Sequence, residues 1–90
     1  MSGSIIEDEA FRRQVEQLGG AEVVDQALDT IMDGLCHNPR GFHFHEAGEY
    51  SFRYARTHAI GDDIPAFTVI FILDNDDNVH LKQIEEDVGF

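Results

Sequence analysis

The stretch Ala66-Phe67-Thr68-Val69-Ile70-Phe71-Ile72-Leu73 decides the fold of this chain. Thr68 carries its only polar side chain, and β-branched and aromatic residues make up most of the rest. Apolar runs of this length and composition are typical of strands at the centre of a sheet. The sequence therefore predicts a central strand over residues 66–73, buried on both faces, with Phe71 fully enclosed in the core.

Further strands are expected on both sides of this run. Residues 42–45 and 50–55 alternate aromatic with mostly polar side chains, a period of two that indicates half-buried strands. After residue 73, Asp74–Asn78 predicts a turn, and residues 79–84 alternate again. Three or four antiparallel strands are therefore expected.

Two helices are predicted ahead of these strands. The first should begin at Ser4 or Asp8 and end at Gly19-Gly20, since glycine commonly ends a helix. Its apolar positions recur at helical spacing and are Ile6, Phe11, Val15 and Leu18. The second carries an apolar stripe over residues 23–35 and ends where Pro39 disfavours helical backbone before it.

This order of elements predicts an α+β fold, with an N-terminal helical hairpin packed on one face of a three- to four-stranded antiparallel sheet. Ninety residues suffice for one core. We therefore expect a single domain over residues 1–90. Residues 1–5 are predicted to form a flexible N-terminus and residues 85–90 an acidic C-terminal tail.

The chain is strongly acidic, with 18 Asp and Glu against six Lys and Arg and a formal net charge of -12. Its apolar fraction of 42%, with seven phenylalanines, is too high for a disordered acidic tail. The charge is therefore expected on the surface of a folded domain. Such a field repels phosphate backbones and anionic membranes and favours basic partners and multivalent cations.

Cys36 is the single cysteine, which excludes an internal disulfide and a cysteine-based zinc cluster. It is expected to be buried, and its reduced state suits the cytoplasm. Residues 1–4 carry no basic side chain and form no apolar stretch, and no apolar run approaches the ~20 residues of a membrane span, so we expect neither a leader peptide nor a membrane span. We expect a cytoplasmic protein with no cofactor.

Three segments resemble the RelE/ParE toxin superfamily over roughly residues 6–86. They are Leu35-Cys36-His37-Asn38-Pro39-Arg40-Gly41 as the helix-to-strand junction, Arg53-Tyr54-Ala55-Arg56 as the arginine-bearing strand, and Ile64–Asp74 with Val79–Ile84 as the last hairpin. The resemblance implies a RelE/ParE-like fold. Members usually have a first strand ahead of the helices, for which this chain offers only residues 1–5.

The resemblance also implies candidate catalytic residues, because members of the family cut messenger RNA in the ribosome. It gives Arg53 and Arg56 as phosphate contacts, Tyr54 as a stacking or acid–base group, and His80 or Lys82 as the proton-transfer residue. RNA cleavage needs a base, an acid and a cation for the developing charge. Strand alternation, however, places Arg53 and Tyr54 on opposite faces of a regular strand, and Tyr54 is expected in the core.

The acidic composition favours a different use of the fold. A domain of -12 lacks the positive field that would hold RNA. We therefore expect a toxin–antitoxin-type domain that acts mainly through protein–protein contact, with an antitoxin-like or other basic partner on its sheet face or edge. An active mRNA-cleaving toxin is the alternative, and homo-oligomerisation is left open.

His43-x-His45, with Glu49 four residues on, resembles the first metal motif of cupins. Alternation places both imidazoles on one face of a strand, a spacing that can chelate a transition metal. A small histidine-based metal-binding protein is therefore a second alternative. The helical first third does not suit a cupin, and two imidazoles alone are expected to bind zinc weakly.

Asp74-x-Asp76-x-Asn78 has the ligand spacing of a calcium loop, with Leu81 and Glu85 at the later positions. Val79 replaces the glycine that such a loop needs, and predicted strands rather than helices flank it. A hairpin turn is the expected structure.

Overall fold

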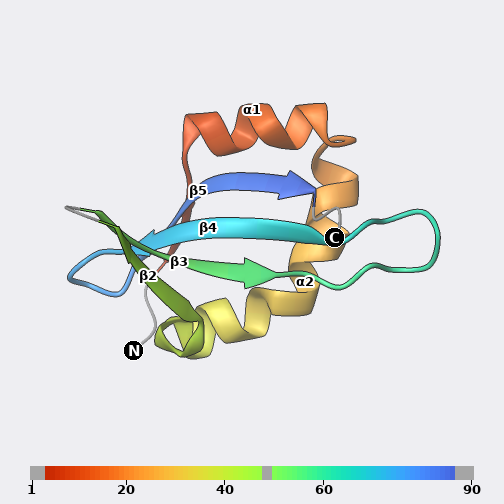
Figure 1. Cartoon of the computed structure of the whole chain (residues 1–90). Helices are drawn as coiled ribbons and strands as arrows, with labels where there is room; N and C mark the ends of the chain where they lie inside the picture. The colour runs from red at the N-terminus through yellow and green to blue at the C-terminus, as the bar shows by residue number, and fades with distance from the viewer. Residues whose placement is uncertain (1–3, 48–49, 87–90) are drawn as a thin grey trace.

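The computed structural model describes residues 4–47 and 50–86 of the chain, as two helices and a five-stranded sheet (Figure 1). In chain order the elements are β1 (Ile5–Glu7), α1 (Glu9–Gln17), α2 (Ala21–His37), the 3-10 turn η1 (Pro39–Gly41), β2 (His43–Ala47), β3 (Tyr50–Arg56), β4 (Phe67–Leu73) and β5 (Val79–Glu86). The α+β prediction is therefore confirmed.

The sheet has the strand order β1-β5-β4-β3-β2, which places β4 at its centre as predicted. The predicted strand number is wrong, because the described residues form five strands, and the additional strand runs parallel to β5. The other three pairs are antiparallel. The additional strand is β1, whose three residues are too few to show a period of two.

The sheet includes residues near both ends of the chain that were predicted to lie outside it. Residue 5, placed in a flexible N-terminus, lies in β1, and the Val79 N–H donates to the carbonyl oxygen of Ser4 at 2.8 Å. Glu85 and Glu86, placed in a tail, pair with Thr68 and Phe67 of β4. Main-chain pairing needs no apolar side chain, so the sequence pattern did not reveal it.

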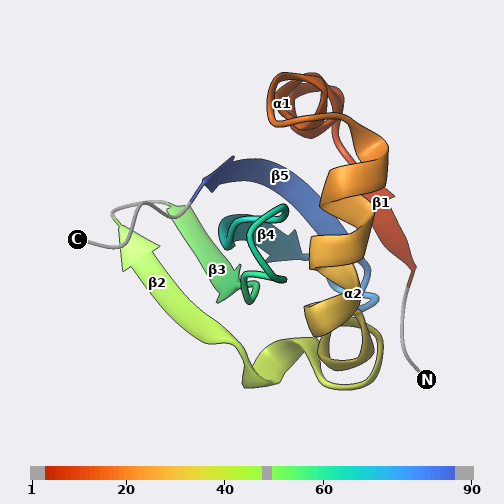
Figure 2. The same ribbon diagram turned by 90° about the vertical axis from the view of Figure 1, so that its right-hand side faces the viewer.

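The two helices meet at a steep corner rather than as the predicted hairpin (Figures 1 and 2). Gly19 and Gly20 form this corner with φ angles of 113° and 92°, a region that disfavours side chains. The helix α1 begins only after Asp8, so Ile6 lies in β1 instead of on the helix.

The helix α2 carries the predicted apolar stripe on its inner side. Its buried residues are Val24, Ala27, Leu28, Ile31 and Leu35. Cys36 is half-buried rather than enclosed in the core as expected, because it lies beside this stripe and not within it. Neither described helix combines the length and apolar character needed to cross a membrane.

The helices lie on one side of the sheet, and the core forms between the two layers (Figure 2). Phe67, Val69 and Phe71 of β4 point into this core and are fully buried. Ile72 lies on the opposite face with 38% of its surface exposed. The prediction that β4 is buried on both faces is therefore wrong, because no described element covers the second face.

A β-bulge interrupts the pairing of β4 with β5. Ile70 pairs with Gln83 and Phe71 pairs with Leu81, so Lys82 is an extra residue in β5. Beyond the bulge, the Ile84 N–H donates to Oε1 of Gln14 in α1 at 2.8 Å. The Gln14 side chain thus accepts a hydrogen bond from a backbone N–H of β5 that lies beyond the three residues paired with β1.

Replacing Phe71 by alanine should lower the free energy of unfolding by roughly 3–5 kcal/mol, because the ring is fully enclosed and its loss leaves a cavity. Urea unfolding at equilibrium measures the change. The matched control is Ile72→Ala, on the uncovered face, which should cost no more than about 1 kcal/mol. Equal losses at the two positions would contradict the one-sided core.

Candidate functional site

The sheet face turned away from the helices, here called the open face, is the main candidate surface. Cross-strand pairing places His43, Tyr54, Ile70 and Gln83 in one row across β2, β3, β4 and β5. Directly opposed residues project to the same face, so these side chains are neighbours. The remaining members of the open face are His45, Phe52, Arg56, Thr68, Ile72, His80 and Glu85.

A shallow hollow of about 370 Å³ lies in the open face. Its apolar lining comes from alternate residues of β3 and β4, and its acidic lining from the end of β5. The lining residues are Phe52, Tyr54, Arg56, Thr68, Ile70, Glu85 and Glu86. The hollow combines apolar side chains with two carboxylates and the Arg56 cation, a mixture that suits an amphipathic ligand with basic groups near the glutamates.

Aromatic rings continue the open face onto the edge strand β2. The imidazole of His43 stacks on Tyr54 with ring centroids 5.1 Å apart and planes 13° from parallel. His45 lies against Phe52 at the same centroid distance, with planes tilted by 40°. Tyr54 is therefore a partly buried surface residue rather than the core residue expected from the sequence.

The two arginines predicted as phosphate contacts lie on opposite faces of the sheet. Arg53 pairs with Phe71 and so projects to the helix side of β3, whereas Arg56 lies on the open face and lines the hollow. The Arg53 Nη1 atom donates to the carbonyl oxygens of Arg40 and Phe42, at 3.0 Å each. Its guanidinium carbon also lies 4.9 Å from the centroid of the Phe44 ring. Arg53 therefore holds the junction of η1 and β2.

The two predicted proton-transfer residues each contact an acidic side chain away from the hollow, His80 through a hydrogen bond and Lys82 through an ion pair. His80 Nε2 lies 3.0 Å from Oδ2 of Asp74. Lys82 Nζ lies 2.5 Å from Oδ2 of Asp8, the residue before α1. Of the five candidates for RNA cleavage, only Tyr54 and Arg56 line the hollow, and the structure does not bring the five together.

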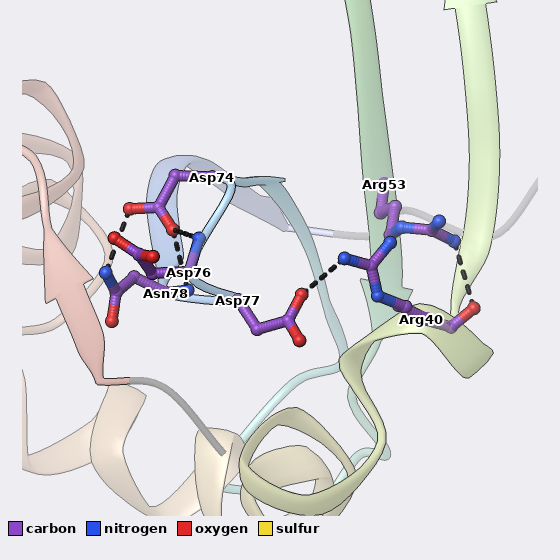
Figure 3. Close-up of polar contacts among 6 residues, drawn as sticks. All are labelled: Arg40, Arg53, Asp74, Asp76, Asp77 and Asn78. Carbon is purple, nitrogen blue, oxygen red and sulfur yellow. Dashed lines mark hydrogen bonds and ion pairs between the residues drawn. The ribbon is translucent and has the colours of Figure 1, made fainter. Parts of the chain in front are cut away.

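The segment Asp74–Asn78 is a hairpin turn between β4 and β5, as predicted (Figure 3). The Asp74 carboxylate accepts hydrogen bonds at 2.9 Å from the backbone N–H groups of Asp76 and Asn78 and from the Asn78 side-chain amide. With His80, these donors hold the carboxylate against its own turn. The residues with calcium-loop spacing thus form a hairpin turn in which the Asp74 carboxylate accepts hydrogen bonds from the turn itself.

The same turn is tied to the β2 end of the sheet. Asp77, which has a φ of 62°, forms an ion pair with the Arg40 guanidinium of η1. Figure 3 shows this pair and the further hydrogen bond from Arg53 to the Arg40 carbonyl oxygen. These contacts join the β4–β5 turn, η1 and β3, and they orient the start of β2.

The histidine pair is only part of a metal site in one chain. His43 and His45 are exposed on the open face of β2, as strand alternation predicts. Glu49, the predicted third ligand, lies outside the described residues. Within residues 4–47 and 50–86, no three His, Cys, Asp or Glu side chains are close enough together to hold a metal ion.

The hollow itself was not predicted from the sequence, although a signal for it is present. Once Phe71 is assigned to the core, counting by two along β4 places Ile70 and Thr68 on the other face. The same count fails for Glu85 on β5, because the bulge at Lys82 shifts the alternation by one residue. Tyr54 was expected in the core because the alternation along β3 does not show which of the two sheet faces is uncovered.

Comparison of the chain with protein-family models, curated proteins and solved structures found no match.

Acid should remove the stabilisation that the Asp74 carboxylate provides. The hydrogen bond from His80, followed by those from Asn78 and Asp76, holds the pKa of Asp74 well below its ordinary value of 3.8. A carboxyl whose pKa is lowered on folding stabilises the fold above its unfolded pKa, and this contribution disappears as the pH falls toward the folded pKa. The destabilisation caused by Asp74→Ala should thus be largest near neutral pH and shrink below about pH 4.

Urea unfolding of the parent chain and the variant across this pH range measures the difference. Asp76→Ala is the matched control, because Asp76 reaches Asp74 through a backbone N–H that alanine retains. A cost of Asp74→Ala that stays constant into acid would contradict the role of the ionised carboxylate.

Proposed function

We propose that this chain is a RelE/ParE-like interaction domain whose open face binds a basic, amphipathic helix of a partner protein. The observation that carries the proposal is the one-sided sheet. Both helices pack on one face, and the other face keeps Phe52, Tyr54 and Ile70 around a hollow. A sheet face of this kind gains stability when a second apolar surface covers it.

The chemistry of the hollow supports a basic helix as the occupant. Apolar side chains at helical spacing would cover Phe52 and Ile70, and Lys or Arg on the flank would meet Glu85 and Glu86. The net charge of -12 would also draw a basic partner toward the domain and raise its association rate. Charge thus favours the same class of partner as the local side chains.

The element order supports the RelE/ParE-like part of the proposal. The resemblance implies a first strand ahead of two helices, and β1 occupies that place at the edge of the sheet. The hairpin formed by β4 and β5 occupies the place implied for the last hairpin. An antitoxin-like protein is accordingly the proposed class of partner.

An mRNA-cleaving toxin is the second candidate, favoured by one observation. Tyr54 and Arg56 line the same hollow, so a stacking or acid–base group lies near a cation. Glu85 and Glu86 line it too, and they would repel the phosphate that Arg56 is required to bind. The local charge balance therefore favours the interaction domain.

A synthetic helical peptide of Leu, Ala and Lys, with Lys confined to one side, should bind the domain. Fluorescence anisotropy measures the binding, and the same peptide with Glu in place of Lys should not bind. Ile70→Lys should weaken binding at least about tenfold, because it places a charge in the floor of the hollow.

Asp29→Asn is the matched control, since it changes the net charge by the same amount on the exposed side of α2. Equal binding of the Lys and Glu peptides, or equal weakening by both variants, would remove the support for the open face.

Expression of the chain without a partner should leave the growth of a bacterial host unchanged, because a net charge of -12 repels the phosphate backbone of RNA. Growth curves after induction provide the measurement. Arrested growth that Arg56→Ala restores would establish the toxin instead. Arg56 is the informative position, since Arg53→Ala would also disturb the junction of η1 and β2.

A further inference from the structure

The edge strand β2 presents a histidine pair to solvent. β2 is the last strand in the sheet order, so one of its sides has no neighbouring strand among the described residues. His43 and His45 project from the same face, two residues apart, and both are exposed. Their contacts with Tyr54 and Phe52 orient the rings while the outer edges stay accessible. These features make β2 a half-site for a metal ion.

A single copy cannot complete this site from the described residues. Structural zinc takes four ligands in a tetrahedral arrangement, with Zn–N distances of about 2.0–2.1 Å to histidine. His43 and His45 supply two, and the described residues form no group of three or more potential ligands. Another copy of β2 offers the same two imidazoles and would supply the two ligands that the described residues of one copy lack.

We propose that two copies of this chain pair their β2 strands antiparallel and hold one zinc ion between four histidines. Only one register brings all four together, the one centred on Phe44. In that register His43 of each copy lies directly opposite His45 of the other. Opposed residues in antiparallel strands share a face, so all four imidazoles project to the same side.

The expected spacing suits a single ion. Opposed Cβ atoms in antiparallel strands are about 4.5–5.5 Å apart. Residues two apart along one strand are about 6.8 Å apart. The four Cβ atoms thus outline a rectangle whose centre is about 4 Å from each corner. Imidazoles leaning inward from these corners can reach an ion above the centre.

Phe44 provides a second, independent reason for the same register. It lies between the two histidines on the opposite face of β2, with 54% of its surface exposed. On the two-fold axis it would lie directly opposite Phe44 of the second copy. Each ring would cover the other, and Arg53, which packs over the Phe44 ring, would hold it in place.

Net charge makes the association dependent on the cation. Each copy carries -12, so two copies repel one another when no cation lies between them. A divalent ion on the axis offsets part of this repulsion and supplies coordination bonds. We therefore expect the chain to be a monomer in the absence of zinc and a dimer when zinc is bound.

Light scattering after size-exclusion chromatography tests this inference on the full chain, with EDTA or with zinc chloride. The expected result is a monomer in EDTA and a dimer in zinc, containing one zinc per two chains by elemental analysis. His45→Ala should abolish the zinc-induced dimer. His58→Ala, an exposed histidine outside β2, should leave it intact and is the matched control.

A second variant separates the register from metal binding alone. Phe44→Glu keeps all four histidines and places two like charges opposite each other on the axis, so the zinc-induced dimer should be lost. Unfolding curves in EDTA verify that each variant is folded. An unchanged mass in zinc, one zinc bound per monomer, or a dimer that survives His45→Ala would each overturn the proposal.

Discussion

The packing of alternate β4 side chains beneath two helices is the constraint on which the rest of the structure depends. Phe67, Val69 and Phe71 are fully buried, and β4 lies at the centre of the strand order. Burial of a phenylalanine side chain contributes about 1.5–3 kcal/mol, so these residues fix which face the helices cover. Because the helices cover that face, the opposite face stays open and carries the hollow and the row of aromatic rings.

The parts of the fold that could be predicted from the sequence are those whose residue pattern is local and distinct. The stripe of α2, the apolar run of β4 and the polar Asp74–Asn78 turn each give a clear period or turn signal. The parts it missed depend on distant contacts. The strand β1 is defined by pairing with a segment more than 70 residues away, and no local pattern reveals that partner.

The candidate site was less predictable than the fold, for a related reason. Strand alternation correctly separated Arg53 from Tyr54, but it gave no sign that Arg53 binds two carbonyl oxygens near η1. Lys82 is likewise engaged by Asp8, an acid far from it in sequence. Arg40 and Lys82 each form an ion pair with an acid that is distant in the chain, and no local pattern of the sequence identifies these partners.

The bulge at Lys82 gives β5 one residue more than its pairing requires. Val79 and Leu81 point inward before it, and Ile84 points inward after it, a spacing of two followed by three. Deletion of Lys82 would therefore make the ladder regular while every other β5 side chain kept its face. The deletion would remove the tether between β5 and Asp8 at the start of α1. The extra residue serves the attachment of helix to sheet and is dispensable for the sheet alone.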